Sequence, residues 1–200
     1  MVQKRRNTAV RQGQILNAAR KVIVKYGSEH VTVKRIAKEV GISEAAVYRH
    51  FTSKRAILSS LADQIEELLL GDLEAEVAAS GGTALETLDR VLRNHLSAVE
   101  QRRGISFLVI AEIISLGDKK LNGKMSDIIS KYSNRIADLI SQGVKAGEVR
   151  KDTDPEVAAT VFFGTIQALV DSWHLSNYSF DLEDKYVHYW EFLRSALVRR

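Results

Sequence analysis

Apolar residues recur at intervals of three and four along almost the whole chain, which is the spacing of one buried helix face. Gly27 can stop the first such helix, whose inner face consists of Ile15, Ala18, Ala19, Val22 and Ile23. The pattern continues to Leu197 without a convincing strand, and Asp154 followed by Pro155 is typical of a helix start. We therefore expect an all-α fold of about nine helices.

Two closely spaced helices are expected between Thr32 and Phe51. Thr32 and Ser43 can each cap a helix, and Gly41 can take the positive φ that turns the chain out of the first one. The apolar residues that can form one small core are Ile36, Val40, Ile42, Val47 and Phe51. Caps, glycine and apolar faces together predict a helix-turn-helix, a motif that reads DNA.

Charge is divided unevenly between the two ends of the chain. Residues 1–55 contain thirteen Lys and Arg against three Glu, a net charge of +10, whereas the remainder contains sixteen basic and twenty-two acidic residues, a net charge of −6. Such a division favours a polyanion-binding head, although chance asymmetry on a solvated surface is the alternative. We expect a DNA-binding domain over residues 1–55 and a second, helical domain over residues 56–200.

The residues offer little catalytic or metal-binding chemistry. The chain has no cysteine and five scattered histidines, and it has no recognisable Ser/His/Asp spacing, nucleotide-binding glycine loop or metal cluster. We accordingly expect neither enzyme activity nor a cofactor nor a metal. The apolar stretch Val157–Val170 is too short and too polar to span a bilayer, and the absence of cysteine fits a cytoplasmic protein.

The second helix of the motif is expected to face the bases. If Val47 and Phe51 face inward, helical geometry places Ala45 and Arg49 outward. The guanidinium of Arg49 can bond guanine O6 and N7 together, whereas Glu44 either accepts from a cytosine amino group or, slightly preferred, complements the helix dipole. The residues expected at the DNA are Thr32, Ser43, Glu44, Ala45, Ala46, Tyr48, Arg49, His50 and Lys54.

The stretch Gln14–Leu61 resembles the DNA-binding domain of the TetR family of bacterial and archaeal regulators. The residues that carry the resemblance are Ile15-Leu16, Ala18-Ala19, Tyr26-Gly27, Val31-Thr32-Val33, Ile36-Ala37, Val40-Gly41-Ile42-Ser43, Val47-Tyr48-Arg49-His50-Phe51, and Lys54 ahead of Leu58. The resemblance implies an all-helical dimer whose C-terminal body binds a small inducer. It assigns phosphate contacts to Thr32, Ser43, Tyr48, His50 and Lys54, and base contacts to Glu44, Ala45, Ala46 and Arg49.

The resemblance also implies dimerisation through the last two long helices. The residues expected at that seam are Phe162, Thr165, Leu169, Trp190 and Leu193, which an ordinary intrachain core explains equally well. An effector pocket is expected where polar groups lie among apolar helices. The candidates are His95, Phe107, Ile110, Glu112, Tyr132, Gln167 and Trp173, for which a surface position or a satisfied core position is the alternative.

The expected function is that of a transcriptional regulator. We expect a repressor that binds a pseudo-palindromic operator on double-stranded DNA as a homodimer and is released by a small, largely hydrophobic effector. The alternative is a DNA-bound scaffold that binds a protein partner, because Ser43–Phe51 closely resembles the same segment of the family's nucleoid-occlusion division inhibitor. Many dispersed genomic sites would favour the scaffold, and one or two sites would favour a local repressor.

Overall fold

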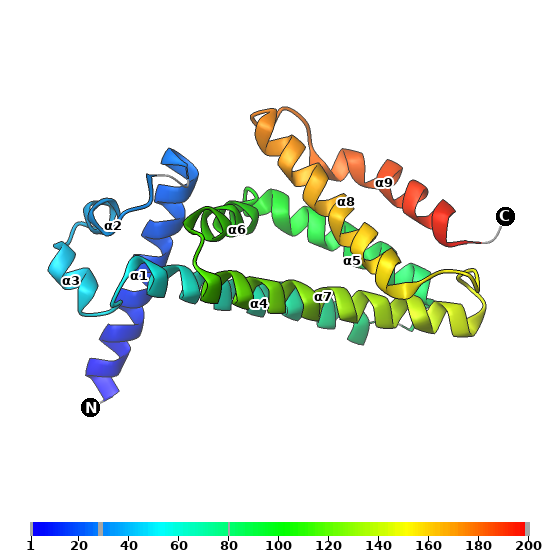
Figure 1. Cartoon of the computed structure of the whole chain (residues 1–200), viewed down its shortest axis with the longest axis horizontal. Helices are drawn as coiled ribbons and strands as arrows, with labels where there is room; N and C mark the ends of the chain where they lie inside the picture. Colours follow the sequence, from blue (N-terminus) through cyan, green and yellow to red (C-terminus); the bar gives the residue numbers. More distant parts are fainter. Residues whose placement is uncertain (1, 28–29, 80, 199–200) are drawn as a thin grey trace. The chain divides into compact units, whose positions relative to one another are not determined.

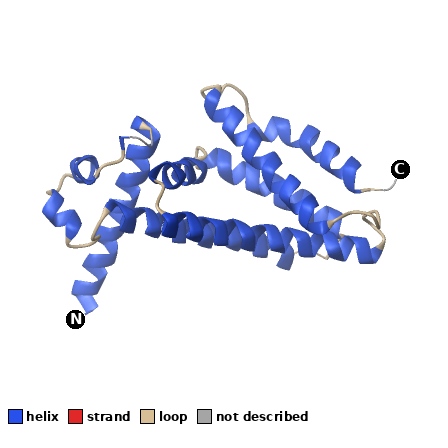
Figure 2. Cartoon of the chain, viewed as in Figure 1, coloured by secondary structure: helices blue, strands red, loops and turns tan. Residues whose placement is uncertain are grey.

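The chain is helical throughout the part that the structure describes. The computed structural model describes residues 2–27, 30–79 and 81–198, with side chains from residue 8 onward, and no strand occurs within them (Figures 1 and 2). The helices of these residues are α1 (Val2–Tyr26), α2 (Val33–Val40), α3 (Glu44–Tyr48), α4 (Lys54–Ala78), α5 (Ala84–Gln101), α6 (Ile105–Leu116), α7 (Lys119–Ala146), α8 (Pro155–Leu175) and α9 (Leu182–Leu197). The predicted all-α fold of about nine helices is confirmed. None of the helices in the described residues is long and apolar enough to cross a membrane.

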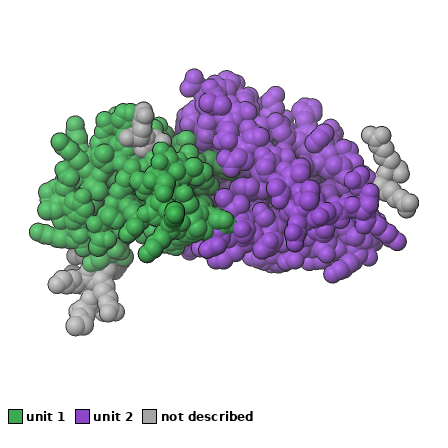
Figure 3. Space-filling model, in the orientation of Figure 1, with its two compact units in different colours: residues 1–65, 105–126 green, residues 66–104, 127–200 purple. Residues whose placement is uncertain are grey.

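The chain divides into two compact units (Figure 3). Unit 1 comprises residues 1–65 and 105–126, and unit 2 comprises residues 66–104 and 127–200. Unit 1 therefore contains α1 to α3, α6, and the first turns of α4 and α7. The expected boundary at residue 55 falls within the first turn of α4, and α6 lies with the head because it packs against α1.

The core of unit 1 joins the helix-turn-helix to its neighbours. Ile15 of α1, Ile36 of α2, Val47 of α3 and Ile113 of α6 are completely buried. Burial of such side chains contributes about 1.5–3 kcal/mol each relative to exposure. The motif is thus held by α1, which also packs against α6, as well as by its own short core.

The core of unit 2 is built mainly from α5, α8 and α9, which pack against one another, together with the apolar face of α7. Thr83 begins α5 with a capping box, in which its side chain accepts from the backbone N–H of Glu86 and the Glu86 carboxylate accepts from that of Thr83. Asp154 caps α8 ahead of Pro155, as the sequence predicts.

The expected dimer-seam residues divide between the interior and the partly exposed surface. Phe162, Leu169 and Leu193 are at most 4% exposed within the single chain, whereas Thr165 and Trp190 are half-buried. The first three therefore belong to the core of the single chain. The apolar spacing of a helix shows that one face is buried, but it does not show whether the same chain or a second copy buries that face. The exposed apolar residues of the same two helices are Val157, Val161, Leu175, Val187 and Phe192.

Candidate nucleic-acid interface

The turn of the helix-turn-helix is made by Gly41, at φ 78° and ψ 35°. Its backbone N–H donates to the carbonyl oxygens of Ala37 and Lys38, at 3.0 and 3.2 Å, and the N–H of Ile42 donates to that of Ala37 at 3.0 Å. This left-handed ending satisfies the last carbonyl groups of α2 and is strained for any residue with a Cβ. The sequence prediction for Gly41 is correct.

The two helices of the motif begin at side-chain caps. The Thr32 hydroxyl oxygen accepts from the backbone N–H of Arg35 at 3.2 Å, and the Ser43 hydroxyl oxygen accepts from that of Ala46 at 3.2 Å. Each hydroxyl keeps its own hydrogen, which can still be donated to a phosphate oxygen. Both residues are exposed, so the cap role and a phosphate contact are compatible.

The recognition helix α3 is fixed from one side and open on the other. Val47 is completely buried and Phe51 is 6% exposed, whereas Glu44, Ala45 and Arg49 are exposed. Among the remaining expected contacts, Tyr48 is 49% exposed, and Ala46 and His50 are half-buried. The described face therefore exposes the Arg49 guanidinium, a group that can donate two parallel hydrogen bonds, beside the small side chain of Ala45.

Lys54, expected at a phosphate, forms an ion pair with a carboxylate of the interior. Its Nζ lies 2.5 Å from Oε1 of Glu112 on α6, and Glu112 is 2% exposed while the Lys54 side chain is 28% exposed. Glu112 is the one buried charged residue among the described residues. From the sequence we expected Glu112 in an effector pocket, because it is a polar group in an apolar helix. The spacing of apolar residues indicates which helix face is buried, but it does not indicate which residue pairs with Glu112.

The expected effector residues fall in both units. Phe107, Ile110 and Glu112 lie on α6 in unit 1, and His95, Tyr132, Gln167 and Trp173 lie in unit 2. Two of the latter have local partners: the Trp173 indole N–H donates to the carbonyl oxygen of Phe180 at 2.7 Å, and the Gln167 amide donates to Asp171 at 3.4 Å.

His95 and Tyr132 form a polar pair inside unit 2. His95 Nδ1 lies 3.1 Å from the Tyr132 hydroxyl, and the Tyr132 ring meets that of Phe163 edge-on at 5.7 Å between centroids. Burial lowers the pKa of His95 to about 4, and the nearby Asp72 opposes this effect only in part. Burial also raises the pKa of Tyr132. Both side chains are therefore neutral near pH 7.

Comparison with known proteins agrees with this geometry. Residues 15–61 match the family "Bacterial regulatory proteins, tetR family", and residues 58–196 match "YsiA-like protein, C-terminal region". The fatty acid metabolism regulator protein of Bacillus subtilis is 27% identical, over 84% of this chain and 86% of that protein. The nucleoid occlusion factor SlmA of Photobacterium profundum is 22% identical, over 94% of this chain and 95% of that protein.

The fold of this chain is also similar to that of solved transcriptional regulators. The transcriptional regulator FadR from Bacillus subtilis in complex with stearoyl-CoA superposes with a TM-score of 0.81 at 27% identity, covering 92% of this chain and 98% of that chain. PfmR of Thermus thermophilus, described as a TetR family transcriptional regulator, has a TM-score of 0.79 at 22% identity, covering 92% and 99%, and so shares the fold. The two family matches together extend from the helix-turn-helix to α9, and the chain belongs to the TetR family of DNA-binding transcriptional regulators.

Proposed function

We propose that the chain is a homodimeric repressor that leaves a pseudo-palindromic operator when it binds a fatty acyl-CoA. The observation that carries the proposal is the 27% identity to the fatty acid metabolism regulator protein of Bacillus subtilis, which extends over 84% of this chain. The solved FadR of that organism, bound to stearoyl-CoA, has the same fold over 92% of this chain. A fatty acyl-CoA also fits the expectation of a largely hydrophobic effector.

In this proposal, α3 reads the operator. Arg49 bonds a guanine edge, Ala45 and Ala46 approach a thymine methyl, and Glu44 complements the helix N-terminus. The exposure of this face and the net charge of +10 over residues 1–55 support the assignment. The phosphate contacts are assigned to the donors of Thr32, Ser43, Tyr48 and His50, while Lys54 supports the motif through Glu112.

Dimerisation is assigned to the outward faces of α8 and α9. Val157 and Val161 of α8 are 59% and 50% exposed, and Phe192 of α9 is 69% exposed. The exposed Gly164 and Ala168 continue the α8 stripe and permit close approach of a second helix. Two copies of α3 spaced by about one DNA turn (~34 Å) would read two half-sites.

The acyl group is assigned to the apolar interior of unit 2 around Tyr132. The neutral pair of His95 and Tyr132 can bond a carbonyl oxygen without bringing a charge into an apolar site. Phe163 lies beside the same tyrosine ring. Glu112 has no part in this assignment because Lys54 occupies its carboxylate.

The scaffold function is the second candidate. The match to nucleoid occlusion factor SlmA covers 94% of this chain, at 22% identity. Mapping of bound DNA across the genome separates the two, because a scaffold occupies many dispersed sites and a local repressor occupies few.

Operator release tests the proposal directly. The affinity of the full-length protein for its selected operator is measured by fluorescence anisotropy without ligand and with stearoyl-CoA, CoA or stearate. We expect stearoyl-CoA to weaken operator binding at least tenfold, which corresponds to a coupling of about 1.4 kcal/mol. Equal operator affinity with and without stearoyl-CoA would contradict the proposal.

A further inference from the structure

Three side chains of residues 105–126 contact the first turns of α4, and all the residues involved belong to unit 1. The contacts are those of Glu112 with Lys54, of Asp118 with Arg55, and of Lys124 with Ser59 and Asp63. Only five residues, 49–53, separate the beginning of α4 from the last residue of α3. The direction in which α4 begins therefore affects the placement of α3.

The connection from α3 to α4 is short and hydrogen-bonded at both of its ends. The backbone N–H groups of His50 and Phe51 donate to the carbonyl oxygen of Val47, at 2.9 and 3.0 Å, and the Phe51 side chain is buried. Ser53 begins α4, because its hydroxyl oxygen accepts from the N–H of Ala56 at 3.1 Å. A rotation of the first turn of α4 would therefore move α3 with it.

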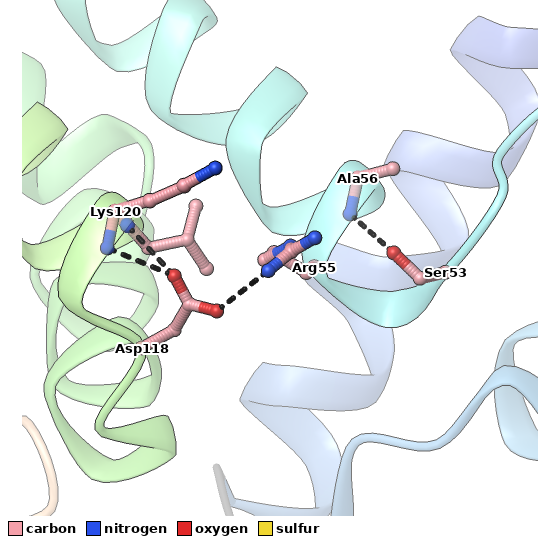
Figure 4. Close-up of polar contacts among 6 residues, drawn as sticks. Ser53, Arg55, Ala56, Asp118 and Lys120 are labelled. Atoms are coloured by element: carbon pink, nitrogen blue, oxygen red, sulfur yellow. Dashed lines mark hydrogen bonds and ion pairs between the residues drawn. The ribbon is translucent and has the colours of Figure 1, made fainter.

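Asp118 joins the beginning of α4 to the beginning of α7 (Figure 4). One of its carboxylate oxygens accepts from the backbone N–H groups of Lys120 and Leu121, at 3.0 and 3.1 Å, and so caps α7. The other oxygen accepts from the Arg55 guanidinium at 3.1 Å. Gly117, at φ 66°, turns the chain from α6 into this cap. The two helices α6 and α7 thus set the position of the carboxylate that holds Arg55.

The pair of Asp118 and Arg55 is charged but not part of the core. The Leu121 N–H and then the Arg55 guanidinium lower the pKa of the Asp118 carboxyl group, which therefore stays ionised. The Arg55 side chain is 56% exposed and that of Asp118 is 21% exposed, whereas Glu112 is buried with Lys54. Substitutions in the exposed pair can therefore separate the orientation of α3 from the folding of the protein.

We infer that Asp118 is a positioning residue for operator binding: through Arg55 it holds the first turn of α4, and with it α3, in the orientation that the operator requires. The inference rests on the proposed reading of the operator by α3 and does not depend on the effector. A recognition helix that is already oriented loses less conformational entropy when it binds DNA. Asp118 contacts neither a base nor a phosphate in this role, so its loss should leave the number of phosphate contacts unchanged.

Asp118→Asn tests this role, because asparagine keeps an oxygen for the cap of α7 and replaces the oxygen that accepts from Arg55 by an NH2 group. The matched control is Asp154→Asn, since Asp154 caps α8 in unit 2 by accepting from the N–H groups of Glu156 and Val157, at 3.0 and 3.2 Å. Fluorescence anisotropy gives the affinity of each full-length variant for the selected operator and for a scrambled fragment. We expect Asp118→Asn to weaken operator binding about threefold, the size of a partly exposed ion pair, and to leave binding of the scrambled fragment unchanged. Asp154→Asn should bind both fragments as wild type does.

A double-mutant cycle with Arg55→Gln assigns the effect to the pair. We expect Arg55→Gln to weaken operator binding about threefold, and the double variant Asp118→Asn/Arg55→Gln to bind no more weakly than either single variant, because all three lose the same interaction. Arg55→Lys keeps a charged donor and should bind the operator nearly as wild type does. Hydrogen exchange in the DNA-free Asp118→Asn protein should be faster than in wild type at residues 49–57, since these connect α3 to the first turn of α4.

Three results overturn the inference. One is an operator affinity of Asp118→Asn equal to or higher than that of wild type, where a higher affinity means that the carboxylate competes with DNA for Arg55. Another is a flatter salt dependence of operator binding in Arg55→Gln, which makes Arg55 a phosphate contact. The third is equal weakening by Asp118→Asn and Asp154→Asn. Failure of the proposed function gives a different pattern: Asp118→Asn weakens operator binding, but stearoyl-CoA leaves it unchanged or Arg49→Ala weakens binding to all base variants equally.

Discussion

Replacement of Lys54 by methionine should destabilise the protein by leaving the Glu112 carboxylate buried without its cation. Glu112 is 2% exposed and lies 2.5 Å from the Lys54 ammonium. Removing one partner of a buried ion pair costs about 3–5 kcal/mol, and we expect the lower end because the Lys54 side chain is 28% exposed and water can enter. Lys54→Met should therefore lower the free energy of unfolding by about 3 kcal/mol.

A double-mutant cycle isolates the pair. Glu112→Leu leaves the Lys54 ammonium without its carboxylate but partly in contact with solvent, so we expect it to cost less than Lys54→Met, about 1 kcal/mol. The double variant Lys54→Met/Glu112→Leu should recover most of the loss of Lys54→Met, because an apolar pair of similar size replaces a buried ion pair at little cost. Urea unfolding at one fixed protein concentration gives all the free energies, since the proposed dimerisation would make stability concentration-dependent.

An exposed ion pair provides the control for this cycle. Lys21 and Glu39 lie 3.8 Å apart, and the Lys21 side chain is 72% exposed. Lys21→Met should change the free energy of unfolding by less than about 0.5 kcal/mol. If Lys54→Met lowers the free energy of unfolding no more than Lys21→Met does, the interior ion pair does not stabilise the fold. The same conclusion follows if the losses caused by the Lys54 and Glu112 substitutions are additive in the double variant.

Three further predictions concern base reading, dimerisation and pH. Arg49→Ala should cost about 1–3 kcal/mol at one base position of the operator, measured by anisotropy on a set of single-base variants; uniform weakening would make Arg49 a phosphate contact. Phe192→Asp should dissociate the dimer in sedimentation velocity, whereas Ile114→Asp on α6, also strongly exposed, should not. The pKa of His95 is about 4 in the folded protein and near 6.5 in the unfolded chain, so the free energy of unfolding should fall as pH drops from 6.5 towards 4. The Tm of His95→Gln should fall less than that of wild type over this pH range, and an equal fall in both proteins would contradict the prediction.

The helix-turn-helix could be predicted from the sequence because its signals are local. Thr32 and Ser43 cap helices that begin one residue later. Gly41 ends α2 with a positive φ, and the carbonyl groups that its N–H contacts belong to Ala37 and Lys38 of the same helix. Each signal acts within four residues, and the apolar faces of α2 and α3 confirm the same register.

The partners of the body helices could not be predicted in the same way. The apolar stripe of α8 identifies Phe162 and Leu169 as buried, but spacing alone does not tell whether the same chain or a second copy covers them. Glu112 and Lys54 are distant in sequence and meet because α6 lies in the same unit as the start of α4. Such long-range pairs depend on the tertiary arrangement of the helices, and the spacing of apolar residues along the chain does not predict that arrangement.

Selection of DNA by the full-length protein tests the central claim that α3 reads an operator. DNA fragments are enriched from the whole genome by binding at physiological salt, and the affinity for the enriched site is compared with that for a scrambled site of the same composition. We expect the enriched site to bind at least about 10³-fold more tightly and to contain two related half-sites. Equal affinity for the two fragments, with a shared steep dependence on salt, would contradict the claim.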